Sequence, residues 1–238
     1  MPRKKAKGGE LPPIKLIKQG NCTLEAIESP SPLIIDIKYN LGIGGGSNVV
    51  LIETDRRVLV DTGFEYESRR ESGDFERNGK YLIRALADCG YTPDDIDAVF
   101  ITHWHLDHFG NLGIFPKAEL LASSSLVEEV GLKDFTGMDD GEEIAEKVKV
   151  MLTPGHTRAH ASLILNSEIR VAVAGDAIVS LSYFDKGKLW NYNQDFSSTE
   201  EGLSSMERLA RSSDLIIPGH GLPFLTYLPE WIKKASNT

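Results

Sequence analysis

Apolar and β-branched residues occur in short runs near the start of the chain, and turn residues separate these runs. The runs at 14–17, 33–37, 48–53 and 58–61 each predict a β-strand. The glycine-rich stretch at 42–46 lies between two of them and predicts a flexible hairpin. This part of the chain is therefore expected to form a strand-rich meander.

Helical spacing first appears between Leu82 and Cys89, and Gly90 predicts the end of that helix. A second helix is predicted to begin at a capping box formed by Ser198 and Glu201. Further strands are predicted at 98–102, 119–122, 148–152, 162–165, 171–174 and 215–217, and a last helix at 228–236. The order is neither a regular strand–helix alternation nor an all-β chain. It predicts an α/β (more strictly α+β) fold with two packed sheets and helices outside them.

The composition is that of a globular protein. Of the 238 residues, 41% are hydrophobic and 26% are charged, which fits one large domain. The formal net charge of −9 opposes broad attraction to nucleic acid, although it leaves room for a local basic groove. Residues 1–13 are basic and contain glycine and proline, so we expect a mobile tail there and one hydrolase domain over residues 14–238.

Targeting signals are weak in this sequence. No apolar run approaches the ~18 residues that a membrane span needs, and no apolar segment follows the basic first residues. Cys22 and Cys89 are too far apart to indicate a disulfide framework or a zinc knuckle. We therefore expect a cytoplasmic protein with no membrane partner.

The strongest chemical signal is a set of histidines and aspartates at the ends of predicted strands. Residues 103–108 read His-Trp-His-Leu-Asp-His directly after one strand. Residues two apart in an extended run point the same way, so His103 and His105 can share one metal, while Asp107 and His108 can reach a neighbouring point. Three more candidate ligands each follow a later strand: His156, Asp176 and His220. Imidazole and carboxylate groups suit a borderline cation such as zinc.

The segment at 103–108 matches the H-x-H-x-D-H signature and resembles the metallo-β-lactamase superfamily; the later Gly-His, Gly-Asp and Gly-His pairs occur in family order. The resemblance covers roughly residues 14–225 and implies a four-layer αββα sandwich with a metal site at one sheet edge. It implies these ligand sets: His103, His105 and His156 for one metal, Asp107, His108 and His220 for the second, and Asp176 as a bridge. It further implies that Asp61 orients the histidine loop. His160 is expected to be a buried structural histidine, with a substrate or proton contact as the alternative.

Two zinc ions at such a site, or manganese or iron in their place, would share a bridging hydroxide that attacks the substrate. Asp107 and Asp176 are the expected catalytic residues, orienting that hydroxide or moving its proton. The predicted activity is hydrolysis of a small ester, lactone or thioester, as in the lactonases and glyoxalase II-like enzymes that the ligand set resembles. The lactonases have a tyrosine where this chain has Val179, which weakens that particular parallel.

Two other activities stay open. Segments 111–116 and 218–224 are similar to the metallo-β-lactamase-domain-containing protein 1 group, to which nuclease activity has been attributed. A single-stranded RNA phosphodiesterase or nuclease is therefore the first alternative. The second is a mononuclear-iron sulfur dioxygenase that would use only His103, His156 and Asp176.

Residues 181–196 hold a dense group of aromatic side chains. We expect four of them to line the substrate site: Tyr183, Phe184, Trp190 and Tyr192. A homodimer contact or simple loop packing is the competing interpretation.

Overall fold

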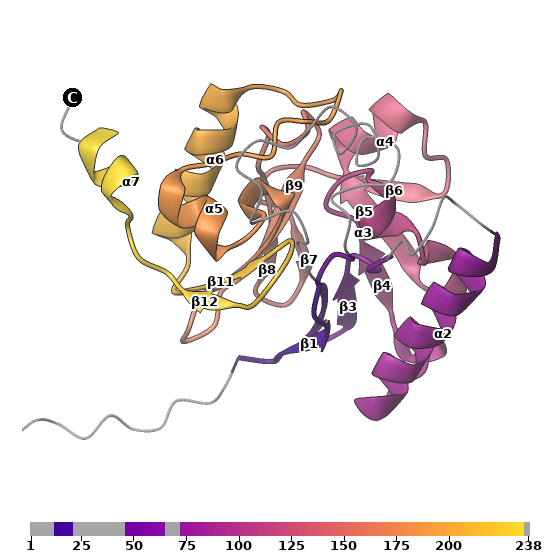
Figure 1. The fold of residues 1–238 in the computed structure, drawn as a ribbon. Coiled ribbons are helices and arrows are strands. Elements are labelled where there is room, and N and C mark those ends of the chain that lie inside the picture. Colours follow the sequence, from indigo (N-terminus) through magenta and orange to yellow (C-terminus); the bar gives the residue numbers. More distant parts are fainter. Residues whose placement is uncertain (1–11, 21–45, 65–71, 236–238) are drawn as a thin grey trace, which may run out of the picture.

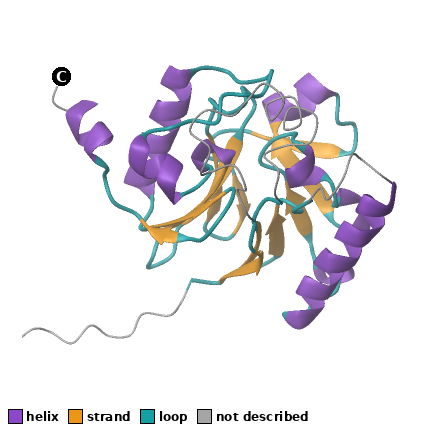
Figure 2. Ribbon diagram, viewed as in Figure 1, coloured by secondary structure: helices purple, strands orange, loops and turns teal. Residues whose placement is uncertain are grey.

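The computed structural model describes residues 12–20, 46–64 and 72–235, and two six-stranded sheets form its centre (Figures 1 and 2). The first sheet follows chain order: β1 (Ile14–Lys18), β2 (Val49–Glu53), β3 (Arg57–Val60), β4 (Ala98–Phe100), β5 (Glu119–Ser123) and β6 (Phe135–Met138). Its first three strands pair antiparallel, and β3 to β6 pair parallel.

The second sheet runs in the reverse order, from β12 to β7. Its strands are β7 (Glu143–Ala145), β8 (Val148–Leu152), β9 (Ala161–Leu165), β10 (Val171–Gly175), β11 (Leu215–Pro218) and β12 (Phe224–Leu225). β10 pairs parallel with β11, whereas β8 and β10 each pair antiparallel with β9. The carboxyl ends of β8, β10 and β11 therefore lie at one edge of the sheet.

Helices cover the outer faces of both sheets. α2 (Ser72–Asp88) lies outside the first sheet, and α5 (Leu181–Lys186) and α6 (Thr199–Ser212) lie outside the second (Figure 1). The shorter helices are α3 (Leu106–Phe109), α4 (Ser124–Val130), α7 (Glu230–Ala235) and the 3₁₀ turns η1 (Pro93–Asp95), η2 (Leu112–Ile114) and η3 (Asp176–Ile178). The predicted four-layer αββα sandwich is confirmed.

The packing explains why β9 and β10 are almost entirely apolar, with Ser162 as the one polar residue of the two strands. Leu163 and Val173 belong to the core between the sheets, whereas Ile164 and Ala172 pack in a separate core with Leu209 of α6. Side chains alternate between the two faces of a strand, and here both faces are covered. Burial on both sides is what removes the polar positions that usually mark a strand's exposed face.

The strands predicted within the described residues are confirmed, most within one residue at either end. The largest difference is at β4, which ends at Phe100 rather than at residue 102. There the Thr102 amide donates to the Asp61 carboxylate at 2.9 Å, so a side chain takes the place of the next strand partner. The predicted strand 33–37, most of the hairpin 42–46 and tail residues 1–11 lie outside the described residues, and the division at residue 13 stays a prediction.

Within the part of the chain that is described, every helix is too short or too polar to cross a membrane.

Candidate metal centre

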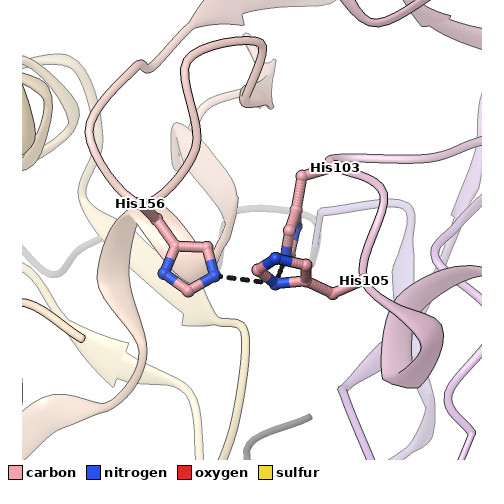
Figure 3. Close-up of side chains that lie close together, drawn as sticks. All are labelled: His103, His105 and His156. Atoms are coloured by element: carbon pink, nitrogen blue, oxygen red, sulfur yellow. Dashed lines mark hydrogen bonds between the residues drawn. The ribbon is translucent and has the colours of Figure 1, made fainter. Parts of the chain in front are cut away.

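Three histidines from two segments of the chain point their ring nitrogens at a common point (Figure 3). His103 and His105 follow β4, and His156 follows β8. His105 Nδ1 lies 2.9 Å from His103 Nε2 and 3.1 Å from His156 Nε2. Nitrogens around a tetrahedral zinc ion stand ~3.3 Å apart, given Zn–N bonds of about 2.05 Å. The trio therefore fits one small cation.

A second group lies beside the first. Asp107 and His108 belong to α3, and His220 follows β11. His220 Nε2 lies 3.5 Å from Asp107 Oδ2, and His108 Nε2 lies 3.9 Å from the same oxygen. Candidate ligand atoms of these three residues all lie within 4.8 Å of one another, as they do in the first trio.

Asp176 lies between the two groups. Its Oδ2 is 3.4 Å from His156 Nε2, on the side of the first trio. Its Oδ1 is 3.3 Å from both His108 Nε2 and His220 Nε2, on the side of the second. One carboxylate thus offers one oxygen to each group, which is the position predicted for a bridging ligand.

The hydrogen-bond partners of the outward-facing ring nitrogens indicate where each histidine carries its proton. Each of the five histidines directs its other nitrogen to an acceptor: His103 to Thr102 Oγ1, His105 to Asp195, His108 to Asp61, His156 to the Trp190 carbonyl and His220 to the Gly46 carbonyl. Carbonyls and carboxylates can only accept, and the Thr102 hydroxyl already donates to Asp61. All five imidazoles therefore carry a proton on the outside, and the inner nitrogen of each can present a lone pair to a cation.

The inner atoms are buried, and several have no hydrogen bond among the described residues. These are both carboxylate oxygens of Asp107, both of Asp176, and His108 Nε2. With its proton on Nδ1 alone, His108 would turn a lone pair on Nε2 toward a carboxylate oxygen of Asp176 at 3.3 Å, so this contact needs either a second proton on His108 or a cation between the two atoms. Buried acceptors without donors are costly unless a cation lies between them. The residues present therefore fit divalent metal ions.

The charge balance of the pocket favours the same conclusion. Burial lowers the pKa of His103 well below its usual value and that of His156 to about 4, so both are neutral at pH 7. Burial also lowers the pKa of His108, but the carboxylates of Asp61, Asp176 and Asp107 outweigh it and raise that pKa well above normal. Burial raises the pKa of Asp176, but the facing histidines outweigh this effect and lower it. The carboxylates thus favour a second proton on His108, and a metal ion between these groups would supply that positive charge in its place.

Asp61 lies where the family resemblance places it. Its carboxylate accepts from His108 Nδ1 at 2.7 Å and from the Thr102 amide and hydroxyl, each at 2.9 Å. Its backbone has φ of +58°, a left-handed conformation that aspartate tolerates better than most residues. Asp61 therefore fixes His108 and the start of the histidine loop together.

His160 uses both ring nitrogens away from the candidate ligands. Nδ1 lies 2.8 Å from Thr153 Oγ1, and Nε2 accepts from the Ala177 amide at 3.3 Å. The side chain is fully buried. Its position supports the expected structural role, since it holds the turn that carries Asp176.

The four aromatic residues expected at the substrate site do not behave alike. Tyr183, Trp190 and Tyr192 form a cluster with Val179, three residues past Asp176, and Tyr192 is partly exposed. Phe184 is fully buried and packs between the second sheet and its helices, with its ring 5.3 Å from that of Phe224. The expectation that Phe184 lines the substrate site is therefore wrong, because its helix directs it into the core.

Several residues of the site carry no motif in the sequence. The Asp195 carboxylate contacts the His105 ring although the two residues are 90 positions apart in the chain. Gly46 and Trp190 contact the histidines through backbone carbonyls. Gly219 must be glycine, because a Cβ there would lie 1.9 Å from Asp176 Oδ1. A Gly-His pair was the only signal that could have revealed this close approach.

Comparisons with known proteins agree with this geometry. A model of the metallo-beta-lactamase superfamily matches residues 42–122. Proteins named metallo-beta-lactamase domain-containing protein 1 from Mus musculus and Xenopus laevis are 34% and 33% identical over 76% and 78% of this chain. The matched part spans 65% of the mouse protein and 77% of the frog protein.

Two further likenesses extend the comparison. An N-acyl homoserine lactonase of Bacillus thuringiensis is 26% identical over 64% of this chain and 69% of its own length. The crystal structure of a putative metallo-beta-lactamase from Thermotoga maritima is 25% identical, covers 89% of this chain and 98% of its own, and superposes with a TM-score of 0.61. This chain therefore belongs to the metallo-beta-lactamase superfamily of metal-dependent hydrolases.

Proposed function

We propose that this protein is a dinuclear metallohydrolase, with zinc as its metal, that cleaves a small ester, lactone or thioester. The observation that carries the proposal is the position of Asp176, whose two oxygens face two separate ligand groups at 3.3–3.4 Å. A single-metal site would leave the group of Asp107, His108 and His220 buried without a function. That cost argues against the mononuclear-iron alternative.

When bound, two cations of this kind supply a water that ionises near neutral pH and polarise the substrate oxygen. The chain's own residues then have distinct tasks. Asp107 turns Oδ2 toward His220, which leaves Oδ1 to take the proton of the attacking water and deliver it to the leaving group. Asp176 holds the two ligand groups at a fixed separation, and Asp61 keeps His108 in the tautomer that can bind metal.

The preference for an uncharged acyl substrate is supported by the surroundings of the site. Tyr183, Trp190 and Tyr192 form an apolar cluster next to the turn that carries Asp176, with the Trp190 and Tyr192 rings 4.9 Å apart. The net charge of −9 disfavours a polyanionic substrate such as RNA. A lactonase among the relatives is consistent with lactone cleavage.

The test combines metal analysis with a substrate panel. Protein purified without chelators is assayed for zinc, manganese and iron, and then incubated with esters, lactones, thioesters and single-stranded RNA. We expect close to two zinc ions per chain and zinc-dependent cleavage in the acyl panel. One iron per chain, or cleavage of RNA with no acyl turnover, would contradict the proposal and favour one of the two alternatives.

A further inference from the structure

One candidate ligand differs from the others in how it is held. The side chains of His103, His108, His156 and His220 are at most 2% exposed, so packing fixes their rings. The His105 side chain is 20% exposed and lies at the edge of the site. A ring that packing does not fix needs a polar partner to hold its orientation.

Asp195 is that partner. Both of its carboxylate oxygens lie near His105 Nε2, at 3.2 and 3.1 Å. The side-chain amide of Asn193 donates through Nδ2 to Asp195 Oδ1 and to the His156 carbonyl, each at 2.7 Å. The carboxylate is therefore itself anchored, and its anchor reaches a second candidate ligand.

The same segment also contacts the ring of His156. The Trp190 carbonyl lies 3.3 Å from His156 Nδ1, and the Ser197 amide donates to the Gly155 carbonyl at 2.9 Å. Residues 190–197 thus lie behind two of the three histidines of the first trio. The second group is held from elsewhere, His108 by Asp61 and His220 by Gly46.

We propose that Asp195 is a positioning residue for the His103–His105–His156 centre, and that it couples the cation of that centre to the placement of segment 190–197. This inference rests on the proposed two-metal function but goes beyond it. Metal bound by His105 holds the ring that Asp195 contacts, and the aromatic pair Trp190–Tyr192 lies on the same segment. The cation of this centre would therefore influence where Trp190 and Tyr192 lie, whereas the outer partners of the second group, Asp61 and Gly46, are outside that segment.

The first experiment measures metal affinity. Zinc binding by wild type, D195A, D195E and the control D185A is followed by competition with a chromophoric chelator. Asp185 is a suitable control because it is an exposed aspartate on α5 whose carboxylate accepts from Tyr227, away from the histidines. We expect D195A to weaken one of the two zinc ions ~10–100-fold, the usual effect of losing such a partner. D195E should recover part of the loss, and D185A should match wild type.

The second experiment follows amide hydrogen exchange in peptides covering 188–197, with and without saturating zinc. We expect zinc to slow exchange there in wild type and D185A, and to do so much less in D195A even when both ions are bound. Equal weakening of both ions, or wild-type affinity together with wild-type protection in D195A, would overturn the inference. A wild type that binds two zinc ions but cleaves no acyl substrate contradicts only the proposed substrate and leaves this test intact.

Discussion

Asp61 is not itself a candidate metal ligand, but one of its carboxylate oxygens holds two residues of the site in position. Its Oδ2 fixes His108 Nδ1 and also accepts from the Thr102 hydroxyl. Asparagine tolerates the φ of +58° at this position and keeps the side-chain shape, so D61N tests the carboxylate rather than the backbone. We expect D61N to weaken zinc binding at the Asp107–His108–His220 group ~10–100-fold.

Chelator competition of D61N against D195A distinguishes the two centres. Each variant should lose affinity for a different zinc ion, because Asp61 contacts His108 and Asp195 contacts His105. The double variant should then weaken both ions. If D61N and D195A weaken the same ion, the assignment of one outer carboxylate to each centre is wrong.

Gly219 provides a purely steric test of the bridging position. A Cβ at this residue would lie 1.9 Å from Asp176 Oδ1 and 2.9 Å from the Gly175 carbonyl carbon, so the carboxylate must move. We expect G219A to fold but to bind fewer than two zinc ions, as measured by elemental analysis. G113A is the matched control, since a Cβ there meets nothing within 4 Å, and it should retain wild-type metal content. Full zinc occupancy in G219A would show that two zinc ions can bind without one Asp176 oxygen facing each ligand group.

The sequence was informative about the residues that face the metal and much less so about those behind them. All seven predicted ligands converge, since each follows a strand and strand ends at one edge are neighbours. The contact of Asp195 with His105 joins residues 90 positions apart within an irregular segment. Trp190 and Gly46 contact the histidines through backbone carbonyls, and the residue type at a position does not reveal such a contact.

At the scale of elements, the Arg170–Asp214 pair joins the starts of β10 and β11. Asp214 accepts from the Arg170 backbone amide at 2.9 Å and from two guanidinium nitrogens at 3.1 and 2.8 Å. These hydrogen bonds lower the Asp214 pKa from 3.8 to about 2. A lowered pKa means that the pair stabilises the fold above pH ~4 and that this stabilisation is lost as the pH falls toward 2.

D214N should therefore be less stable than wild type near pH 7, and the difference should shrink between pH 4 and pH 2. Because both side chains are more than 40% exposed, we expect less than ~1 kcal/mol at pH 7. Urea unfolding at pH 7, 4 and 3 measures the difference. If the difference in unfolding free energy between wild type and D214N stays constant down to pH 3, the charge of Asp214 is not the source of the stabilisation.

Helices and strands with a clear hydrophobic period or a capping motif can be predicted from the sequence, and very short elements cannot. The Ser198 cap is confirmed, since its hydroxyl accepts from the Glu201 amide at 3.1 Å at the start of α6. The sequence pattern predicts neither α4 nor β7, whose seven and three residues are too few to establish a period. Helix α5 falls in the aromatic-rich segment 181–196, and it packs Phe184 into the core rather than toward the substrate site.

At the scale of the whole molecule, the candidate ligands come from both halves of the sandwich. His103 to His108 follow the first sheet, whereas His156, Asp176 and His220 follow strands of the second. Among the described residues, backbone hydrogen bonds that join the halves at this edge run from the Ala161 amide to the Thr102 carbonyl at 2.9 Å and from the Asn48 amide to the Gly219 carbonyl at 2.7 Å. Only the folded state brings the two sets of ligands together. Metal ions bound by both sets would therefore stabilise the folded state relative to the unfolded one.

Removing the metal should lower thermal stability. A ligand at 100 times its dissociation constant stabilises the folded state by ~2.7 kcal/mol, which corresponds to ~5–10 °C in Tm for a chain of this size. Calorimetry with chelator, followed by zinc add-back, measures the shift and its reversal. G219A and the double variant D61N/D195A should show smaller zinc-dependent shifts than wild type, because both disturb ligands that bridge the halves. A chelator that leaves the wild-type Tm unchanged would mean that the two sheets hold this edge together without metal, and that the facing acceptors of His108 and Asp176 are satisfied in some other way.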